Sequence, residues 1–214
     1  MSKQFGARFS LEECYELATE PSPWNVGNKV LYDLCKNMPL HTDTQAVLAK
    51  IWLIGRAYAA AIERRKNKAD SNDGFYETIV GPRMMKSNMD TWLAKTSRYK
   101  KANAASLPLM LETHQNVVKL FETISGLKKR SLASKYLHFH QPAIFYIYDS
   151  RAVSSMRRIS HLIEPFDMND ERGDREYSRF ASKCLAIQEK FWIEFKVHVS
   201  PRELDNMLLA LARN

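Results

Sequence analysis

The chain has 214 residues, of which 45% are hydrophobic, and this excludes a largely disordered protein because a sizeable core can form. Lysine and arginine number 32 against 24 acidic residues, so the net charge of +8 favours a polyanionic partner such as nucleic acid, although many basic proteins bind none. The three cysteines are scattered, which excludes a disulfide framework and the clustered ligands of a zinc or iron–sulfur site.

The apolar segments do not have the form of a signal peptide or a membrane span. Residues 1–14 contain no apolar core of the kind that signal peptides carry. The longest apolar stretch, residues 46–62, is interrupted by Lys50 and Arg56, which favours a buried helix. We therefore expect a cytoplasmic monomer that uses no membrane, metal or other cofactor.

The first half of the chain has a helical pattern. Ser10 and Glu13 form the capping-box spacing at the start of residues 10–19. Apolar residues recur at helical spacing through residues 42–67, which predicts one long helix with a basic end. Gly55 interrupts its apolar face and could admit a ligand or another part of the backbone. Shorter helices are expected at 75–80 and 88–98, separated by a turn at Gly81–Pro82.

The second half continues in the same way. Residues 106–125 form a long amphipathic pattern that ends at Gly126, and a second helix is expected from Ser131 to Pro142. The last helix, residues 200–213, begins with the capping-box pair Ser200 and Glu203. The sequence predicts an all-α, multi-helix fold in one globular unit, residues 1–214, with two lobes in which the chain ends pack together and the middle forms the second.

Residues 124–152 form the most informative segment. A helix ends at Gly126, a basic turn follows, a helix begins at Ser131, and an apolar connector leads to Asp149 at the start of another helix. This order resembles the helix-hairpin-helix superfamily of DNA glycosylases, in which a hairpin is followed by a lysine or other residue, a small packing residue and, about eighteen to twenty positions after the first of these, a catalytic aspartate. Ser131 stands at the position of the family lysine, Ala133 at the small packing residue, and Asp149 follows Ser131 by 18 residues.

The segment also departs from the family pattern. Only Gly126 remains of the usual hairpin glycines, and the aspartate is followed by Ser150 and Arg151 where the family often has threonine and histidine. Ser131 replaces the lysine that forms a Schiff base in bifunctional members, so the resemblance implies a monofunctional glycosylase. Lys135, one helical turn later on the same face, is the alternative amine nucleophile.

The resemblance assigns a role to each group. The carboxylate of Asp149 would stabilise the oxocarbenium-like sugar or activate water, although an aspartate here can equally be a helix N-cap. Lys128, Lys129, Arg130 and Ser131 would clamp a DNA phosphate at the hairpin, and Arg151 would extend this basic face. The alternative for these cations is an exposed, solvated turn and helix face.

A flipped base needs an aromatic or apolar pocket, for which Trp52 and Tyr58 are candidates, although aromatic residues at helical spacing are more often core. His138 and His140 are two residues apart, which does not place both on one helix face, so a structural role is favoured over metal binding.

Three functions remain open at this point. The first is a DNA glycosylase-like enzyme that excises a modified or damaged base, in repair or in defence against phage with modified DNA. The second is a non-catalytic helical DNA-binding protein that retains the hairpin. The third is a helical interaction protein whose charge is incidental. Base release separates the first two, and salt-dependent DNA affinity separates both from the third.

Overall fold

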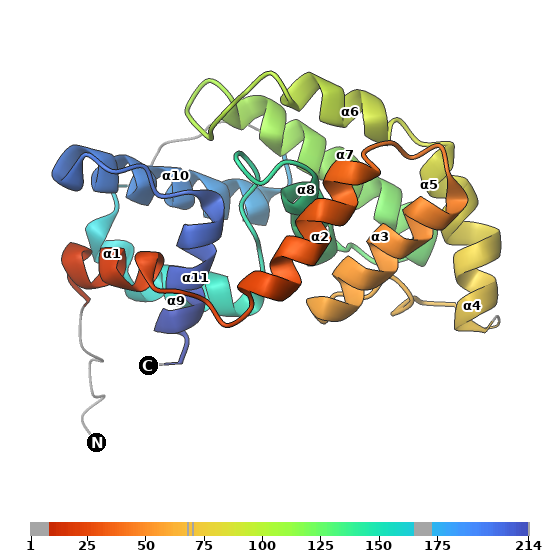
Figure 1. Ribbon diagram of the computed structural model, residues 1–214, viewed down its shortest axis with the longest axis horizontal. Helices are drawn as coiled ribbons and strands as arrows, with labels where there is room; N and C mark the ends of the chain where they lie inside the picture. Colours follow the sequence, from red (N-terminus) through yellow and green to blue (C-terminus); the bar gives the residue numbers. More distant parts are fainter. Residues whose placement is uncertain (1–8, 68, 70, 165–172, 214) are drawn as a thin grey trace.

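The computed structural model describes residues 9–67, 69, 71–164 and 173–213, and among these residues the fold is all-α, with no β-strand, as the sequence predicts (Figure 1). In chain order the elements are α1 (Leu11–Thr19), α2 (Asn25–Asn37), α3 (Thr44–Ala57), α4 (Asn72–Phe75), the π-helix η1 (Tyr76–Val80), α5 (Gly81–Met85), α6 (Met89–Thr96), α7 (Leu107–Ser125), α8 (Arg130–His140), α9 (Ser150–Arg158), the 3₁₀-helix η2 (Ser160–Leu162), α10 (Arg175–Phe195) and α11 (Pro201–Leu211).

Helix α8 lies at the centre of the molecule. Every residue from Leu132 to Phe139 is buried, and α2, α3 and α7 pack against this helix. On one side in Figure 1, α1, α9, α10 and α11 lie together, and α11 contacts both α1 and α9. The expected packing of the two chain ends is therefore present, whereas the division into two lobes stays a prediction. Within the described residues, no helix is both long and apolar enough to cross a bilayer.

Several helix ends follow the sequence signals. Both capping boxes form, at Ser10 with Glu13 and at Ser200 with Glu203. Gly126 ends α7 in the left-handed conformation, with φ of 73°, where a residue without Cβ is favoured. These ends are set by contacts between residues three or four apart, which is why the sequence predicts them.

The single helix expected over residues 42–67 is wrong, because α3 ends at Ala57. Ala59 adopts φ of 50°, and its neighbour Ala60 donates its amide to the Gly55 carbonyl at 2.8 Å, so the chain turns back on the helix. A Cβ on Gly55 would lie 3.1 Å from the Cα of Ala61. The sequence left open whether Gly55 admits a ligand or another part of the backbone, and the structure shows the backbone of Ala61 there.

The turn expected at Gly81–Pro82 is also wrong, because α4, η1 and α5 run on as one helical segment. Proline lacks an amide hydrogen and its ring crowds the preceding turn. The widened π-turn directly before it accommodates this, with the Gly81 amide bonded to the Tyr76 carbonyl. A Cβ on Gly81 would meet the Thr44 side chain at 3.2 Å, so glycine lets α5 approach α3 closely.

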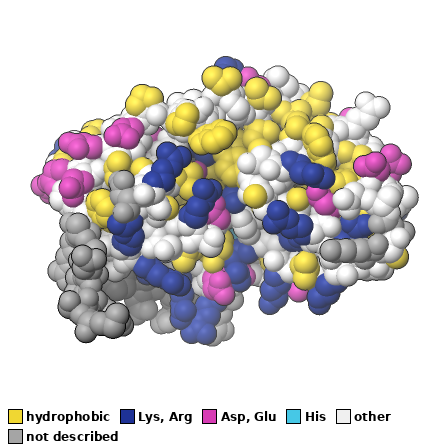
Figure 2. Space-filling model, turned by 90° about the horizontal axis from the view of Figure 1, so that it is seen from below, with side chains coloured by type: hydrophobic (Ala, Val, Ile, Leu, Met, Phe, Trp, Pro, Cys, Tyr) yellow, Lys and Arg dark blue, Asp and Glu magenta, His cyan; other side chains and the backbone are white. Residues whose placement is uncertain are grey.

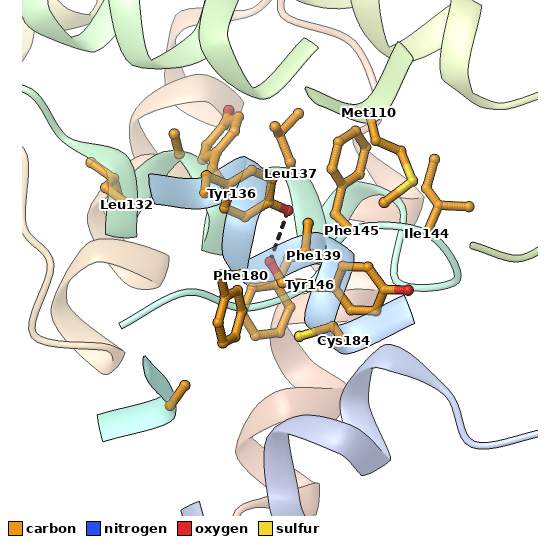
Figure 3. Close-up of a cluster of buried hydrophobic side chains, with 14 of the residues drawn as sticks. Met110, Leu132, Tyr136, Leu137, Phe139, Ile144, Phe145, Tyr146, Phe180 and Cys184 are labelled. Carbon is orange, nitrogen blue, oxygen red and sulfur yellow. Dashed lines mark hydrogen bonds between the residues drawn. The ribbon is translucent and has the colours of Figure 1, made fainter. Parts of the chain in front are cut away.

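The connector, residues 141–148, runs through the core between α8 and α10. Figure 3 shows its Ile144, Phe145 and Tyr146 beside the aromatic side chains of α8 and next to α10. No strand lies beside the connector among the described residues, so its backbone groups need other partners. The Ala143 carbonyl accepts from the Ala102 amide at 3.1 Å, and side chains satisfy the part that leads to Asp149. Three hydrogen bonds do so: Ser134 Oγ accepts from the Tyr148 amide at 2.9 Å, His138 Nδ1 bonds the Phe145 carbonyl at 2.7 Å, and Tyr177 donates to the Tyr146 carbonyl at 3.1 Å.

Candidate functional site

The connector delivers Asp149 to a buried lysine on α8. The ammonium of Lys135 lies 3.3 Å from Asp149 Oδ2, with 2% of the lysine side chain and 15% of the aspartate side chain exposed. The same ammonium donates to Ser131 Oγ at 2.9 Å and to the Tyr58 carbonyl at 3.5 Å. Because an ammonium has three protons, these three acceptors match its three donors.

Asp149 is both the partner of Lys135 and the N-cap of α9. The N-cap role that the sequence offered is therefore confirmed, and the catalytic role stays a prediction. Its Oδ1 accepts from the Ala152 amide at 3.0 Å, and Arg151 lies 4.0 Å from Oδ2. Burial acts to raise the pKa of Asp149, but the Lys135 charge and the Ala152 amide outweigh it, and the pKa lies below its usual value. Asp149 is therefore a carboxylate at neutral pH.

The two aromatic residues proposed for a base pocket lie in different surroundings. The Tyr58 ring is 5.5 Å from the Lys135 ammonium, and its hydroxyl donates to Asn28 at 2.6 Å, so Tyr58 belongs to the Asp149 cluster. Trp52 is 46% exposed on α3, and its neighbour is the Arg56 guanidinium, 5.9 Å from the ring. The structure thus unites Tyr58, but not Trp52, with the ion pair.

A directed chain of hydrogen bonds adjoins this cluster. The Phe145 carbonyl can only accept, so His138 Nδ1 carries the proton and Nε2 is an acceptor. Tyr32 donates to that Nε2 at 2.7 Å and accepts from Arg202 Nε at 2.8 Å. Burial keeps the pKa of His138 well below its usual value, so the ring is neutral. His138 therefore has the structural role that the sequence favoured.

Arg202 and Asp205 also belong to the site, although the sequence pattern did not single them out. Arg202 donates to Asp205 Oδ2 at 3.0 Å, and its guanidinium lies 5.6 Å from the Tyr32 ring and 5.8 Å from the Tyr58 ring. Asp205 is 2% exposed, and burial raises its pKa to about 6. Their spacing of three residues on a helix was the available signal, but it did not disclose that both lie beside Tyr58.

The site therefore contains two carboxyl groups whose surroundings move their pKa values apart. Asp149 stays ionised at neutral pH, whereas Asp205 takes up a proton near pH 6. The Asp149 charge contributes to the raised pKa of Asp205, after burial as the larger cause. Such a pair is the arrangement in which one carboxylate supports a developing positive charge and a second carboxyl group can exchange a proton.

The three cations of the predicted basic turn, Lys128, Lys129 and Arg130, lie in different surroundings. Lys128 is exposed, as a DNA contact requires. The Lys129 ammonium donates to the Ala61 carbonyl at 3.1 Å and also to the Arg64 carbonyl. The Arg130 guanidinium forms two hydrogen bonds to Asp174 and one to Glu176. Lys129 and Arg130 thus join the hairpin to residues 61–64 and to the start of α10.

The contact with residues 61–66 brings other cations to the hairpin. The Lys66 amide donates to the Ser125 carbonyl at 3.0 Å, and a Cβ on Gly126 would lie 3.3 Å from the Lys66 side chain. Arg64 and Lys66 are exposed, like Lys128 and Arg151. Figure 2 shows lysine and arginine side chains spread over the face seen from below in Figure 1. We call Arg64, Lys66, Lys128 and Arg151 the hairpin cations.

Comparison with known proteins does not assign the chain to a family. No family model matches the chain, and no match was found among curated proteins or among solved structures. The described residues contain no group of three or more histidine, cysteine or acidic side chains placed to bind a metal ion. What the site can do therefore follows from its own geometry.

Proposed function

We propose that the protein is a DNA glycosylase-like enzyme that hydrolyses the N-glycosidic bond of a modified or damaged base. The observation that carries the proposal is the position of Asp149: an ionised, largely buried carboxylate at the start of α9, held by Lys135. It lies at the end of the connector that leaves the hairpin helix α8. Hairpin, helix, connector and aspartate follow one another in the same order in the helix-hairpin-helix DNA glycosylases that this segment resembles.

The chemistry is a hydrolysis in which the bond from the sugar to the base breaks and a water oxygen bonds to the same sugar carbon. Positive charge develops on the sugar as the base leaves, and the Asp149 carboxylate stabilises it in a site with little screening by water. The same carboxylate orients the water, whose proton passes to solvent or to the departing base.

The proposal is a monofunctional enzyme. A lysine attacks a sugar carbon only as the free amine, and the three acceptors around Lys135 favour the ammonium. Burial lowers the pKa of Lys135 below its usual value, and the adjacent Asp149 charge offsets this shift only in part. Ser131, at the position of the family lysine, accepts a hydrogen bond from Lys135 and holds it beside Asp149.

The proposed partner is DNA, bound by a cytoplasmic monomer through the hairpin cations. They are exposed, and Lys66 packs against the hairpin glycine, so phosphates would contact this face and leave the target nucleotide near Asp149. The base would leave the stack to reach the carboxylate, beside Tyr58. Repair and defence against phage with modified DNA are both consistent with this chemistry.

Asp149→Asn tests the catalytic assignment. Asparagine caps a helix as well as aspartate but removes the charge that opposes the oxocarbenium. We expect base release from DNA carrying modified bases to fall by about 10²- to 10⁴-fold, with DNA affinity unchanged. Single-turnover excision that proceeds equally fast in the variant would refute the role of Asp149.

Borohydride trapping on a DNA substrate tests the monofunctional chemistry. We expect no trapped complex, and strand breaks only after alkali treatment. Trapping that is efficient in the parent and abolished in Lys135→Ala would show instead that Lys135 is a nucleophile.

The hairpin cations are tested by replacing Arg64, Lys66 and Lys128 together with alanine. If each of these side chains binds one phosphate, the slope of log affinity against log salt should fall by roughly 0.9 for each cation removed. The matched control removes the same charge from three exposed lysines on α2, α6 and α7, namely Lys36, Lys95 and Lys119. Equal salt slopes for the two triple variants would place the DNA elsewhere.

A non-catalytic DNA-binding protein is the second candidate, and one observation favours it. Both oxygens of Asp149 have partners within the protein, the Ala152 amide and the Lys135 ammonium, which is what a purely structural N-cap would show. DNA binding through the hairpin cations without base release from any modified substrate would support this candidate over the enzyme.

A further inference from the structure

A cavity of about 310 Å³ lies outside the Asp149 cluster. It is lined by residues 100–103, Ala143, one face of α10 and residues 198–201, and neither Asp149 nor Lys135 is part of its wall. This volume is at the lower end of the range for small-molecule pockets, about 300–1,000 Å³, so the cavity suits one small ligand. Most of its wall is apolar, including Leu185 and Val199.

An aromatic platform forms one side of the cavity. The rings of Trp192 and His198 stack with centroids 4.2 Å apart and an angle of 5° between their planes. The Lys101 ammonium lies 3.5 Å from His198 Nε2, and this contact holds the imidazole in place. Trp192 is 44% exposed although it is large and apolar. An exposed indole fixed in orientation beside a cavity is suited to stacking against a flat ring.

Charged groups of both signs border the platform. Lys100 and Lys101 are exposed at the rim and can bind an anion, whereas the Glu189 carboxylate on α10 can accept a hydrogen bond. The neighbouring Gln188 is already engaged, because its Oε1 accepts from Tyr146 and its Nε2 donates to the Val199 carbonyl, each at 2.5 Å. Glu189 is thus the acidic group offered to a ligand in this wall.

We infer that this cavity binds a nucleotide, with the base stacked on Trp192 and the phosphate held by Lys100 and Lys101. A simple aromatic carboxylate would satisfy the lysines but would bring no donor to Glu189. The exocyclic amine of adenine or cytosine supplies that donor, and the phosphate supplies the anion at the other end. Basic groups beside an exposed aromatic ring are also the combination that binds single strands without reading their sequence.

The nucleotide could be free or part of a single strand, and titration calorimetry on the full chain distinguishes these sources. The probes are adenosine 5′-monophosphate, adenosine, inorganic phosphate and a short single-stranded oligonucleotide. We expect the monophosphate to bind more tightly than adenosine or phosphate alone. An oligonucleotide that binds while the free monophosphate does not would assign the site to single strands.

Trp192→Ala should weaken binding of the nucleotide by about 5- to 150-fold, the range for loss of one stacked base. Trp52→Ala is the matched control, since Trp52 is exposed to a similar degree, 46%, on α3. Lys100→Ala should weaken binding of the monophosphate but not of adenosine, because Lys100 lines the cavity without contacting His198. Asp149→Asn should leave nucleotide binding at this cavity unchanged. A negative result for the cavity can therefore be distinguished from a negative result for the proposed glycosylase activity.

The inference is overturned if none of the nucleotide probes binds. It is also overturned if Trp192→Ala, folded as judged by circular dichroism, binds them as tightly as Trp52→Ala does. Inorganic phosphate that binds as tightly as the monophosphate would equally overturn it, because the platform would then contribute nothing.

Discussion

The ion pair of Lys135 and Asp149 can be tested by removing its charges separately and together. Asp149→Asn keeps the N-cap of α9 but leaves the Lys135 ammonium, 2% exposed, with only the Ser131 hydroxyl and the Tyr58 carbonyl as acceptors. Breaking a buried pair by removing one partner costs about 3–5 kcal/mol of the free energy of unfolding. We expect the lower end, about 3 kcal/mol, because two acceptors remain.

The opposite change, Lys135→Met, leaves Asp149 with the Ala152 amide, with Arg151 at 4.0 Å and with some access to water. The loss is then that of a hydrogen bond to a charged group, about 1.5–3 kcal/mol. The double variant contains neither charge, so it should lose less than the sum of the two single losses by about 1–3 kcal/mol.

Urea-induced unfolding of the four proteins at pH 7 measures this coupling, provided that each unfolds in one transition with the same slope. The exposed pair Lys29–Asp33, with 75% and 48% of its side chains exposed, is the control. Its coupling should be only about 0.3–0.5 kcal/mol. Losses at Lys135 and Asp149 that add to within about 0.5 kcal/mol would refute the account of the site as one electrostatic unit.

The remaining predictions concern the hairpin and a buried histidine. Gly126→Ala should lower the free energy of unfolding by about 1–2 kcal/mol because of the left-handed φ, whereas Gly27→Ala, in helix α2 with open space around it, should raise it by about 0.5–1 kcal/mol. Arg130→Ala should lower the free energy of unfolding by about 1.5–3 kcal/mol because its hydrogen bonds to Asp174 are removed. Lys128→Ala should change it by less than about 0.5 kcal/mol. Equal losses for the two variants would contradict the finding that Arg130 is bonded within the protein whereas Lys128 faces solvent. Burial lowers the pKa of His41 to about 4 from an ordinary 6.5, so the unfolded state binds more protons between these values. Stability should therefore fall as pH drops from 6.5 towards 4, and His41→Gln should reduce that slope in urea unfolding measured across this range.

The sequence predicts features that depend on neighbours along the chain. The capping boxes, the glycine that ends α7 and the N-cap role of Asp149 each involve groups three or four residues apart. Such contacts form in much the same way wherever the helix lies. For this reason the order of elements around Asp149 follows from the sequence.

Features that depend on distant segments were not predictable in this way. The acceptors of Lys129 lie near residue 61, those of Arg130 near residue 174, and Arg202 reaches Tyr32 across the core. A basic turn has the same sequence whether its cations face solvent or other segments. The early end of α3 likewise depends on Gly55 packing against Ala61, which local periodicity does not encode.

The way in which the connector is held also determines how precisely Asp149 is placed. Along a β-ladder a strand can slip by two residues and find equivalent partners, because the hydrogen-bonding groups repeat. The connector instead has separate anchors at Ser134, His138 and Tyr177, each matched to one backbone group. Inserting or deleting one residue between Phe145 and Tyr148 would break this register and would displace the Asp149 carboxylate from the lysine on α8.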